Sequence, residues 1–260
     1  MRQSFAFLAQ PGTVPIAHRG GALEAEENTL PAFARAVALG YRDIELDVHA
    51  TRDGVVVVHH DATLARMFGD PRPVAAIARD DLARLRTAGG AGLPQLAEVL
   101  AAFPGVRFTI EVKAAAAAEP LARVIRDAGA LDRVCVGSFV PAHTARVRAL
   151  LGPGLCWSPA RAGVAQLWLA GWGLPLPAPA PVVQVPQAFR GIPVVTPRFL
   201  RAARARGVKV QVWTVNEAAD IDRLLDWGVD GIMTDRPTLL RERMLARGLW
   251  PGPKDDGAGG

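Results

Sequence analysis

Residues 208–234, VKVQVWTVNEAADIDRLLDWGVDGIMT, hold two β-rich segments on either side of a helical pattern. The alternating β-branched residues of 208–215 predict a strand, residues 217–227 predict a helix, and residues 231–234 predict a second strand. A strand, a helix and a strand in this order form a parallel βαβ unit, because the helix returns the chain to the same edge of the sheet. This unit places the chain in the α/β class.

The same alternation runs through most of the chain. Six further strands are expected, which makes eight in all, at residues 14–19, 43–48, 107–112, 134–138, 155–158 and 182–185. Helices are expected between them, at residues 30–39, 96–103 and 197–206. Eight is the number of parallel strands that closes a (β/α)8 TIM barrel, so we predict a single barrel domain over residues 1–250.

An open doubly wound sheet is the alternative architecture. Such a sheet usually has a Gly-rich turn after its first strand, and His18-Arg19-Gly20-Gly21 does not match that pattern. The barrel is therefore the favoured interpretation.

Two segments depart from the barrel pattern. Arg52-Asp53-Gly54 is a turn signal leading into residues 55–59, which predict a hairpin extension of the second strand. Residues 62–92 are irregular apart from a helical piece near 80–86, and we expect a small insertion there. Residues 251–260 predict a flexible C-terminal tail.

Composition limits the classes of partner. Of the 260 residues, 50% are hydrophobic and 21% are charged, which excludes a largely disordered chain. The net charge of +5 comes mostly from arginines spread over the predicted helices, and no block of like charges indicates a nucleic-acid-binding arm. A general positive field instead favours a small anionic substrate such as a phosphate ester.

Cellular location is predicted from the cysteines and the apolar segments. Cys135 and Cys156 lie in apolar runs without nearby metal-ligating partners, so a buried reduced pair is expected. The apolar run at residues 5–8 is too short for the core of a signal peptide, which predicts a cytoplasmic protein. The uncharged residues 162–189 contain prolines that would break a membrane-spanning helix. Contact with a membrane surface and the oligomeric state stay open.

Glu45, Asp47 and Glu111 are acidic residues on two adjacent predicted strands. Residues two apart on a strand share a face, so Glu45 and Asp47 point the same way, where their charges repel unless a cation lies between them. Each carboxylate alone is explained by a surface salt bridge. Three at matching strand ends favour a metal site of the oxygen-ligand kind that Mg²⁺ or Ca²⁺ prefers.

Two histidines and two cations accompany these acids. His18 ends the first predicted strand and His60 ends the hairpin, so together they form a candidate general acid and base for ester cleavage. Arg19 and Lys113 supply positive charge for the non-bridging oxygens of a phosphoryl group. In TIM barrels the C-terminal ends of the strands hold the active site.

Zinc is the competing metal. His49 and His59 could contribute to a histidine-rich Zn²⁺ site. Neither a His-x-x-x-His spacing nor a Cys spacing of the usual kind is present, so zinc is less favoured than Mg²⁺ or Ca²⁺.

At these residues the sequence resembles the glycerophosphodiester phosphodiesterase family over about residues 14–250. The motifs that match in order and spacing are His18-Arg19-Gly20, Glu27-Asn28-Thr29, Glu45-Leu46-Asp47, Thr51-Arg52-Asp53-Gly54, His60-Asp61, Glu111-Val112-Lys113, Ser138-Phe139, Trp213-Thr214-Val215-Asn216, Gly228-Val229-Asp230-Gly231 and Thr234-Asp235-Arg236-Pro237. The resemblance is weakest between residues 140 and 195.

The resemblance implies a metal-dependent barrel hydrolase that cleaves a glycerophosphodiester to glycerol 3-phosphate and an alcohol. It implies that Glu45, Asp47 and Glu111 hold Mg²⁺ or Ca²⁺. It also implies that His18 and His60 are the acid–base pair, with Arg19 and Lys113 at the phosphate. Trp213 and Phe139 would line the alcohol side of the pocket. Which histidine is the acid, and whether water or the glycerol hydroxyl attacks first, stay open.

Two departures from the family pattern stand out. Glu26 takes the place of a proline before Glu27-Asn28-Thr29, a loop change that we expect to be tolerated. After Asp61 the family often continues Leu-Asp-Arg-Thr, whereas this chain has Leu64-Ala65-Arg66-Met67. The second departure concerns loop contacts and the substrate, and leaves the metal and histidine sites as expected.

Two other functions compete with this one. A lysophospholipase D would use the same site, with an acyl chain received by Met67 and Phe68 or by the apolar loop at residues 168–181, which includes Trp172. A barrel without catalysis, kept as a binding protein, would be expected to have lost a histidine or a metal ligand. This chain keeps all of them.

Overall fold

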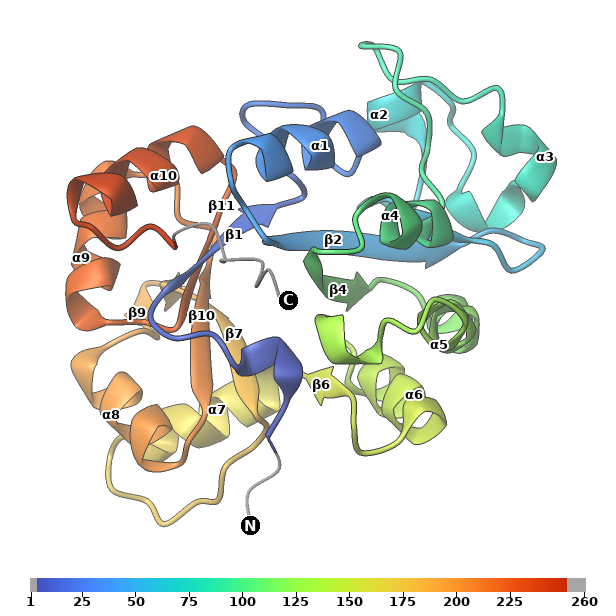
Figure 1. Cartoon of the computed structure of the whole chain (residues 1–260). Coiled ribbons are helices and arrows are strands. Elements are labelled where there is room, and N and C mark those ends of the chain that lie inside the picture. The colour runs from blue at the N-terminus through green and yellow to red at the C-terminus, as the bar shows by residue number, and fades with distance from the viewer. Residues whose placement is uncertain (1–3, 252–260) are drawn as a thin grey trace, which may run out of the picture.

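The computed structural model describes residues 4–251, and eight parallel strands form a nearly closed barrel in it (Figure 1). Neighbouring strands follow the order β6-β5-β4-β2-β1-β11-β10-β7. Their bounds are β1 Val14–His18, β2 Asp43–Ala50, β4 Arg107–Val112, β5 Val134–Gly137, β6 Cys156–Trp157, β7 Val182–Pro186, β10 Lys209–Trp213 and β11 Gly231–Thr234. The predicted (β/α)8 fold is confirmed.

The barrel is completed by a side chain where strands β6 and β7 meet. These are the first and last strands of the sheet order, and they are not paired with each other in it. The backbone N–H of Gln184 on β7 donates a hydrogen bond of 3.2 Å to Oγ of Ser158, just after β6. A hydroxyl thus replaces a strand ladder at this seam.

Helices alternate with the strands around the outside of the barrel (Figure 1). They are α1 Leu30–Ala38, α4 Leu96–Ala102, α5 Ala118–Asp127, α6 Pro141–Leu151, α7 Arg161–Ala170, α8 Pro197–Ala205, α9 Ala218–Trp227 and α10 Pro237–Ala246, with 3-10 turns η1 Ala6–Leu8, η3 Ala115–Ala117 and η4 Leu131–Arg133. Helices α1 and α8 each begin after a threonine whose Oγ1 accepts a backbone N–H, with proline in the first turn. Buried aliphatic side chains of strands and helices form one large core.

The insertion after the second barrel strand is small and has a core of its own. Strand β3 (Val56–Val58) pairs antiparallel with the end of β2, which lengthens β2 by two residues beyond the prediction. The helices α2 (Ala65–Phe68) and α3 (Arg79–Leu82) and the 3-10 turn η2 (Val74–Ala76) follow. Their core is aliphatic and consists of Val57, Leu64, Val74, Ile77, Leu82, Leu85 and Leu93.

A second, short hairpin follows β7. It consists of β8 (Ala188–Phe189) and β9 (Ile192–Pro193), and its residues are exposed. The sequence did not predict this hairpin, nor did it give bounds for α5, α6, α7 or α10. The apolar residues of α6 and α10 are spread around the helix, so the periodic signal is weak there.

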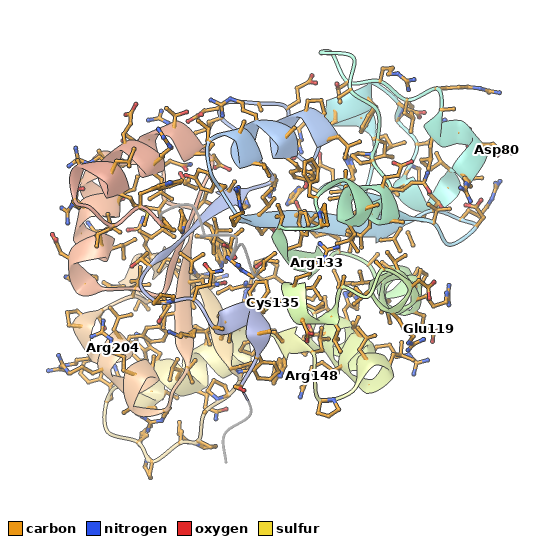
Figure 2. The ribbon with its side chains drawn as sticks, viewed as in Figure 1. Asp80, Glu119, Arg133, Cys135, Arg148 and Arg204 are labelled. Atoms are coloured by element: carbon orange, nitrogen blue, oxygen red, sulfur yellow. The ribbon has the colours of Figure 1, made fainter. Side chains whose placement is uncertain are left out.

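Charge and apolar character separate as expected. Figure 2 shows Asp80, Glu119 and Arg204 on the outside, whereas Cys135 lies in the interior. Cys135 and Cys156 are both buried and free. Between residues 4 and 251, no helix has the length and apolar composition needed to cross a membrane. The tail predicted at residues 251–260 lies, apart from Pro251, outside the described residues.

Candidate active site

Three carboxylates meet where β2 and β4 run side by side. Asp47 of β2 is the register partner of Glu111 of β4, and Glu45 lies two residues before Asp47. One ligand oxygen from each of the three lies within 4.8 Å of the others. Glu45 and Asp47 are buried, while Glu111 is half-buried and faces the open end. Such a set of oxygens matches the ligand preference of Mg²⁺ and Ca²⁺.

The carboxylates of this cluster repel one another. Burial and the neighbouring Asp47 carboxylate raise the pKa of Glu45 to about 8. A buried acid with such a pKa lacks enough positive charge around it, and a divalent cation among the three carboxylates would supply that charge. The donor set and the charge of the cluster therefore fit a divalent cation.

Asp47 is held ionised by two cations. Burial alone would raise its pKa, but Lys113 and Arg19 outweigh that effect and keep the pKa below its usual range. Nζ of Lys113 lies 2.9 Å from Oδ1 of Asp47 and 2.9 Å from Oε1 of Glu111. Nε of Arg19 lies 3.0 Å from Oδ2 of Asp47. Both predicted phosphate-binding cations thus lie directly on the acidic cluster.

The loop after β1 has the conformation that directs Arg19 to this cluster. Arg19 and Asn28 have φ angles of 52° and 58°, in the left-handed region that side chains other than glycine rarely adopt. Nδ2 of Asn28 donates a 3.0 Å hydrogen bond to Oδ2 of Asp47. Gly20 is required between them, because a Cβ there would lie 2.9 Å from Cβ of Ala32. The strained loop is therefore tied to the acidic cluster at both ends.

His18 is oriented by the carboxylate that directly follows the last strand. Nδ1 of His18 lies 2.6 Å from Oδ1 of Asp235, and its Nε2 lies 3.6 Å from Oε2 of Glu45. Nδ2 of Asn216 donates a hydrogen bond of 2.9 Å to the other carboxylate oxygen of Asp235. Burial on its own lowers the pKa of His18, but Glu45 and the hydrogen bond to Asp235 outweigh it and raise that pKa. Nε2 is left to face the acidic cluster.

His60 is oriented by its neighbour in the chain. Nδ1 of His60 lies 2.7 Å from Oδ1 of Asp61, and the second oxygen of Asp61 accepts a 2.7 Å hydrogen bond from Nε of Arg66. Nη2 of Arg66 donates a hydrogen bond of 2.5 Å to Oε1 of Glu27. The same oxygen accepts a hydrogen bond of 3.2 Å from Nη1 of Arg19. One chain of charged hydrogen bonds thus joins His60 to the arginine on the acidic cluster.

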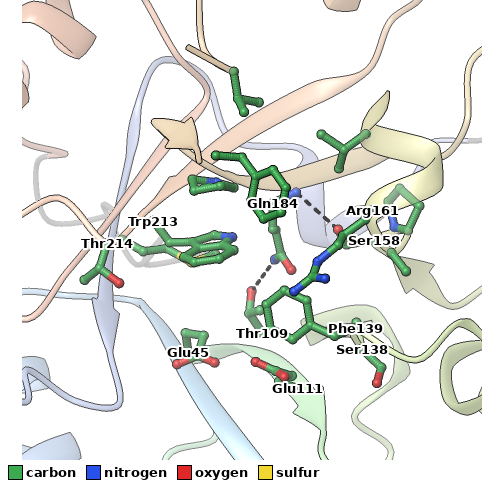
Figure 3. Close-up of a pocket in the computed structure, with 18 of the residues that line it drawn as sticks. Glu45, Thr109, Glu111, Ser138, Phe139, Ser158, Arg161, Gln184, Trp213 and Thr214 are labelled. Carbon is green, nitrogen blue, oxygen red and sulfur yellow. Dashed lines mark hydrogen bonds between the residues drawn. The ribbon is translucent and has the colours of Figure 1, made fainter. Parts of the chain in front are cut away.

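One cavity of about 600 Å³ opens at the mouth of the barrel and is lined by both histidines, Glu45, Glu111, Arg19 and Lys113 (Figure 3). That volume is suited to a small organic ligand. The rings of Phe139 and Trp213 meet edge to face in its lining, with centroids 5.8 Å apart. Polar lining comes from His18, Arg19, Glu45, His60, Thr109, Glu111, Lys113, Ser138, Ser158, Arg161, Gln184 and Thr214.

The opposite wall of the cavity is apolar. It includes Val164 and Trp168 of α7, together with Phe189, Ile192 and Val194 from the hairpin and the segment after it. The sequence located Trp168 in an apolar loop, but it lies on α7.

The other residues expected to receive an acyl chain lie elsewhere. Met67, Phe68 and Trp172 are absent from the described lining of the cavity. Phe68 packs against the core of the insertion, and Trp172 is exposed beneath the guanidinium of Arg198. The insertion is therefore filled by its own core, and the apolar surface at the site comes from the other side of the barrel.

The two histidines of the zinc alternative are engaged with backbone. Nε2 of His49 lies 3.2 Å from the carbonyl of His60, and Nε2 of His59 lies 2.9 Å from the carbonyl of Thr63. Burial lowers the pKa of both histidines. Among the described residues, the group that could hold a metal ion consists of the three carboxylates Glu45, Asp47 and Glu111, without a histidine.

The structure brings every predicted site residue to this cavity or to the acidic cluster beneath it. It adds partners that the sequence did not assign a role: Asp235, Asn216, Asp61, Glu27, Arg66 and Arg161. Asp235 follows the eighth predicted strand directly, so the rule applied to strands one to three would have singled it out. Arg161 follows a two-residue strand and had no such signal.

Comparison with known proteins supports one family. The profile described as "Glycerophosphoryl diester phosphodiesterase family" matches residues 18–239. A Mycobacterium tuberculosis protein named "Probable glycerophosphodiester phosphodiesterase 2" is 39% identical, covering 95% of this chain and 96% of its own. A lysophospholipase D of Homo sapiens is 29% identical, covering 87% and 84%. A crystal structure of glycerophosphodiester phosphodiesterase from Agrobacterium tumefaciens superposes with a TM-score of 0.75 at 25% identity, covering 88% and 99%.

Proposed function

The chain belongs to the glycerophosphoryl diester phosphodiesterase family, and we propose that it hydrolyses glycerophosphodiesters to glycerol 3-phosphate and an alcohol. It is a phosphoric diester hydrolase that acts on a small-molecule substrate. The observation that carries the proposal is that His18 and His60 line the same cavity as Glu45 and Glu111. An acid, a base and a metal-binding cluster at one small cavity are what cleavage of a phosphodiester requires.

Glu45, Asp47 and Glu111 would hold the divalent cation. When bound, it would polarise a phosphoryl oxygen and offset the negative charge of the carboxylates. Mg²⁺ and Ca²⁺ both accept this oxygen set and differ in the coordination number and rigidity that they demand. Titration of the metal-free protein with Mg²⁺ or Ca²⁺ would decide which ion is used. Calorimetry would measure the affinity for each ion, and an activity assay would measure the rate that each supports.

The two histidines would transfer the protons. One imidazole takes the proton from the attacking oxygen, and the other donates a proton to the departing alkoxide. Asp235 and Asp61 each bind Nδ1 of one histidine, which leaves Nε2 of each for the substrate. Attack by the glycerol hydroxyl would produce a cyclic phosphate first, which phosphorus NMR of the reaction mixture would detect.

Arg19 and Lys113 would bind the non-bridging phosphoryl oxygens. Both lie on the acidic cluster, and attraction to Asp47 raises the pKa of each against the opposing effect of burial. They stay charged at neutral pH and supply the electrostatic stabilisation that phosphoryl transfer needs. Phe139 and Trp213 would contact the alcohol.

A lysophospholipase D activity is the second candidate, and the apolar wall at Trp168 and Ile192 favours it. A matched pair of substrates, glycerophosphoglycerol and lysophosphatidylglycerol, would compare the two activities on one head group. We expect faster turnover of the diester without an acyl chain, because Phe189 and Ile192 of the apolar wall are exposed to solvent.

The test of the main proposal is metal-dependent release of glycerol 3-phosphate. His18→Ala and His60→Ala should each lower kcat by about 10²–10⁴-fold, the range of a positioned acid or base. Circular dichroism would verify that both variants fold. Wild-type rates in both variants, with metal present, would show that the assigned mechanism is wrong.

A further inference from the structure

Arg161 is a cation of the cavity that the proposed mechanism does not use. It is the first residue of α7 and lines the cavity together with Phe139 and Phe189. Figure 3 shows its guanidinium directed into the cavity from the side of Ser158. A side chain in this place would meet the alcohol half of a substrate whose phosphate lay on the acidic cluster.

Arg161 differs from the other two cations in the lining. Arg19 and Lys113 lie within 3.0 Å of carboxylate oxygens. In the part of the chain that the structure describes, no carboxylate lies within ion-pair distance of Arg161. Its guanidinium carbon instead lies 5.6 Å from the ring centroid of Phe139 and 5.4 Å from that of Phe189. Its positive charge is therefore available to a ligand.

The two aromatic rings would otherwise suit a cationic alcohol. Faces of aromatic rings bind quaternary ammonium groups such as choline through cation–π attraction. The guanidinium of Arg161 already lies near both of these rings and would repel a second cation placed among them. An anion, by contrast, would form charge-assisted hydrogen bonds with the guanidinium. The pocket chemistry thus disfavours a cationic alcohol.

The position on the helix strengthens this preference. Arg161 lies at the N-terminal end of α7, where the helix dipole is positive and an additional cation is unfavourable. The first turn of α7 has no acidic residue, and Ala160 before it offers no side-chain cap. An anion at this place would compensate both the guanidinium and the helix end.

We propose that Arg161 determines substrate preference, favouring glycerophosphodiesters whose leaving alcohol carries its own negative charge, such as a second phosphate, over those with a cationic alcohol. The inference rests on the proposed function, because it takes the acidic cluster as the place of the scissile phosphate. It names a specificity-determining residue, and leaves the acid–base chemistry to His18 and His60.

The test compares substrates that differ in the charge of the alcohol. Glycerophosphoinositol and glycerophosphoinositol 4-phosphate differ by one phosphate, and glycerophosphocholine supplies the cationic case. We expect the wild-type kcat/KM to be at least about fivefold higher with the additional phosphate, and lowest for choline, as charged hydrogen bonds at a solvent-facing site would give. High salt should reduce the difference.

Variants locate the effect. In Arg161→Gln the ratio between the two inositol substrates should fall to near one, while Arg161→Lys should keep part of it. Arg190→Gln is the matched control, since Arg190 lies 5.5 Å from the same Phe189 ring without lining the cavity. An equal loss for all three substrates in Arg161→Gln would place Arg161 on the scissile phosphate and overturn the proposal.

Binding separates this inference from the proposed function. Calorimetry on the His18→Ala variant measures the affinity for the same three diesters while turnover is slow. If the wild-type protein cleaved none of them, the proposed function would fail, yet tighter binding of the 4-phosphate that depends on Arg161 would still support the inference. Equal affinities for all three diesters would refute it.

Discussion

Nδ1 of His18 lies 2.6 Å from Oδ1 of Asp235, although 217 positions separate the two residues in the chain. They meet because β1 and β11 are parallel neighbours, with Ala17 and Thr234 as register partners, so that each residue lies one step further along its strand. Asn216 holds Asp235 through two hydrogen bonds. Its Nδ2 donates to the carboxylate of Asp235, and its Oδ1 accepts from the backbone N–H of Asp235. The contact fixes the ring of His18 with Nε2 toward Glu45.

Asp235→Asn should therefore lower kcat by about 10²-fold, because an amide neither fixes the same tautomer nor stabilises the imidazolium. Asp230→Asn is the matched control: Asp230 precedes β11 at its other end, where it pairs with Lys209 at 2.8 Å. That variant should lose a little stability and keep its rate. Steady-state kinetics would measure both, and a wild-type kcat in Asp235→Asn would contradict the orienting role.

Removal of the metal should abolish hydrolysis and lower Tm, since a cation that binds only the folded state stabilises it. Glu111→Gln should weaken metal binding by at least about tenfold, because it removes one charged ligand from the cluster. Glu119→Gln, on the surface of α5, should leave the affinity unchanged. Thermal unfolding at increasing Mg²⁺ or Ca²⁺ would report this, and a Tm insensitive to either ion would argue against the site.

Arg66 should position His60 through Asp61. Arg66→Gln breaks the links to both Asp61 and Glu27, so we expect kcat to fall by about tenfold with a smaller effect on KM. Arg66→Lys should restore part of the loss, because it keeps one charged contact. A merely structural role would instead lower Tm without changing the ratio of kcat to KM.

Arg72→Gln tests whether any arginine of the insertion has this effect. Arg72 is about as exposed as Arg66 and pairs with Asp70 and Asp81, away from the cavity. Its loss should leave kcat unchanged. Equal kinetic effects of the two substitutions would indicate a general loosening of the insertion.

Glu26 holds the insertion against the loop after β1. Its carboxylate accepts hydrogen bonds from Oγ1 of Thr87 at 2.6 Å and from the backbone N–H of Gly89 at 2.7 Å. Glu26→Ala should cost about 1–3 kcal/mol in the free energy of unfolding, because a hydroxyl and an amide lose a charged partner. Hydrogen exchange should accelerate at residues 87–91. Glu242→Ala, exposed on α10, should do neither, and unchanged exchange in Glu26→Ala would refute the contact.

His59 should make the fold less stable in mild acid. Burial lowers its pKa in the folded state below 6.5, so between about pH 6.5 and the folded pKa the unfolded chain binds more protons. The free energy of unfolding therefore falls as the pH drops from 7 toward 5. His59→Gln should flatten that dependence. Denaturant unfolding at several pH values would test the difference, and parallel curves for wild type and His59→Gln would contradict it.

The strands of the barrel could be predicted because each is a short apolar run bounded by turn residues. Residues 231–234 needed no partner to be recognised, and their β11 has the predicted bounds. Strand β2 shows where such prediction stops. Its first residue, Asp43, is as predicted, but the predicted end at residue 48 is two residues short, because pairing with β3 extends the strand to Ala50. The hairpin β8–β9 was missed because each of its strands has only two residues and Pro193 belongs to the second. Strand β6 is equally short, but it lies within the apolar run predicted at residues 155–158.

The sequence by itself determined the kinds of residue at the site and the end of the barrel where they lie. His18 ends β1, Glu111 lies one residue before the end of β4, and Glu45 lies beside His18 as its register partner on β2. Parallel strands bring such residues to one rim whatever their spacing in the chain. Only the tertiary structure decided what each of them touches. Asp235 meets His18 through the closure of β1 on β11, and Arg161 faces Phe139 and Phe189 from separate segments. Periodicity is a local property of a strand, whereas a contact across the barrel depends on the packing of all eight strands.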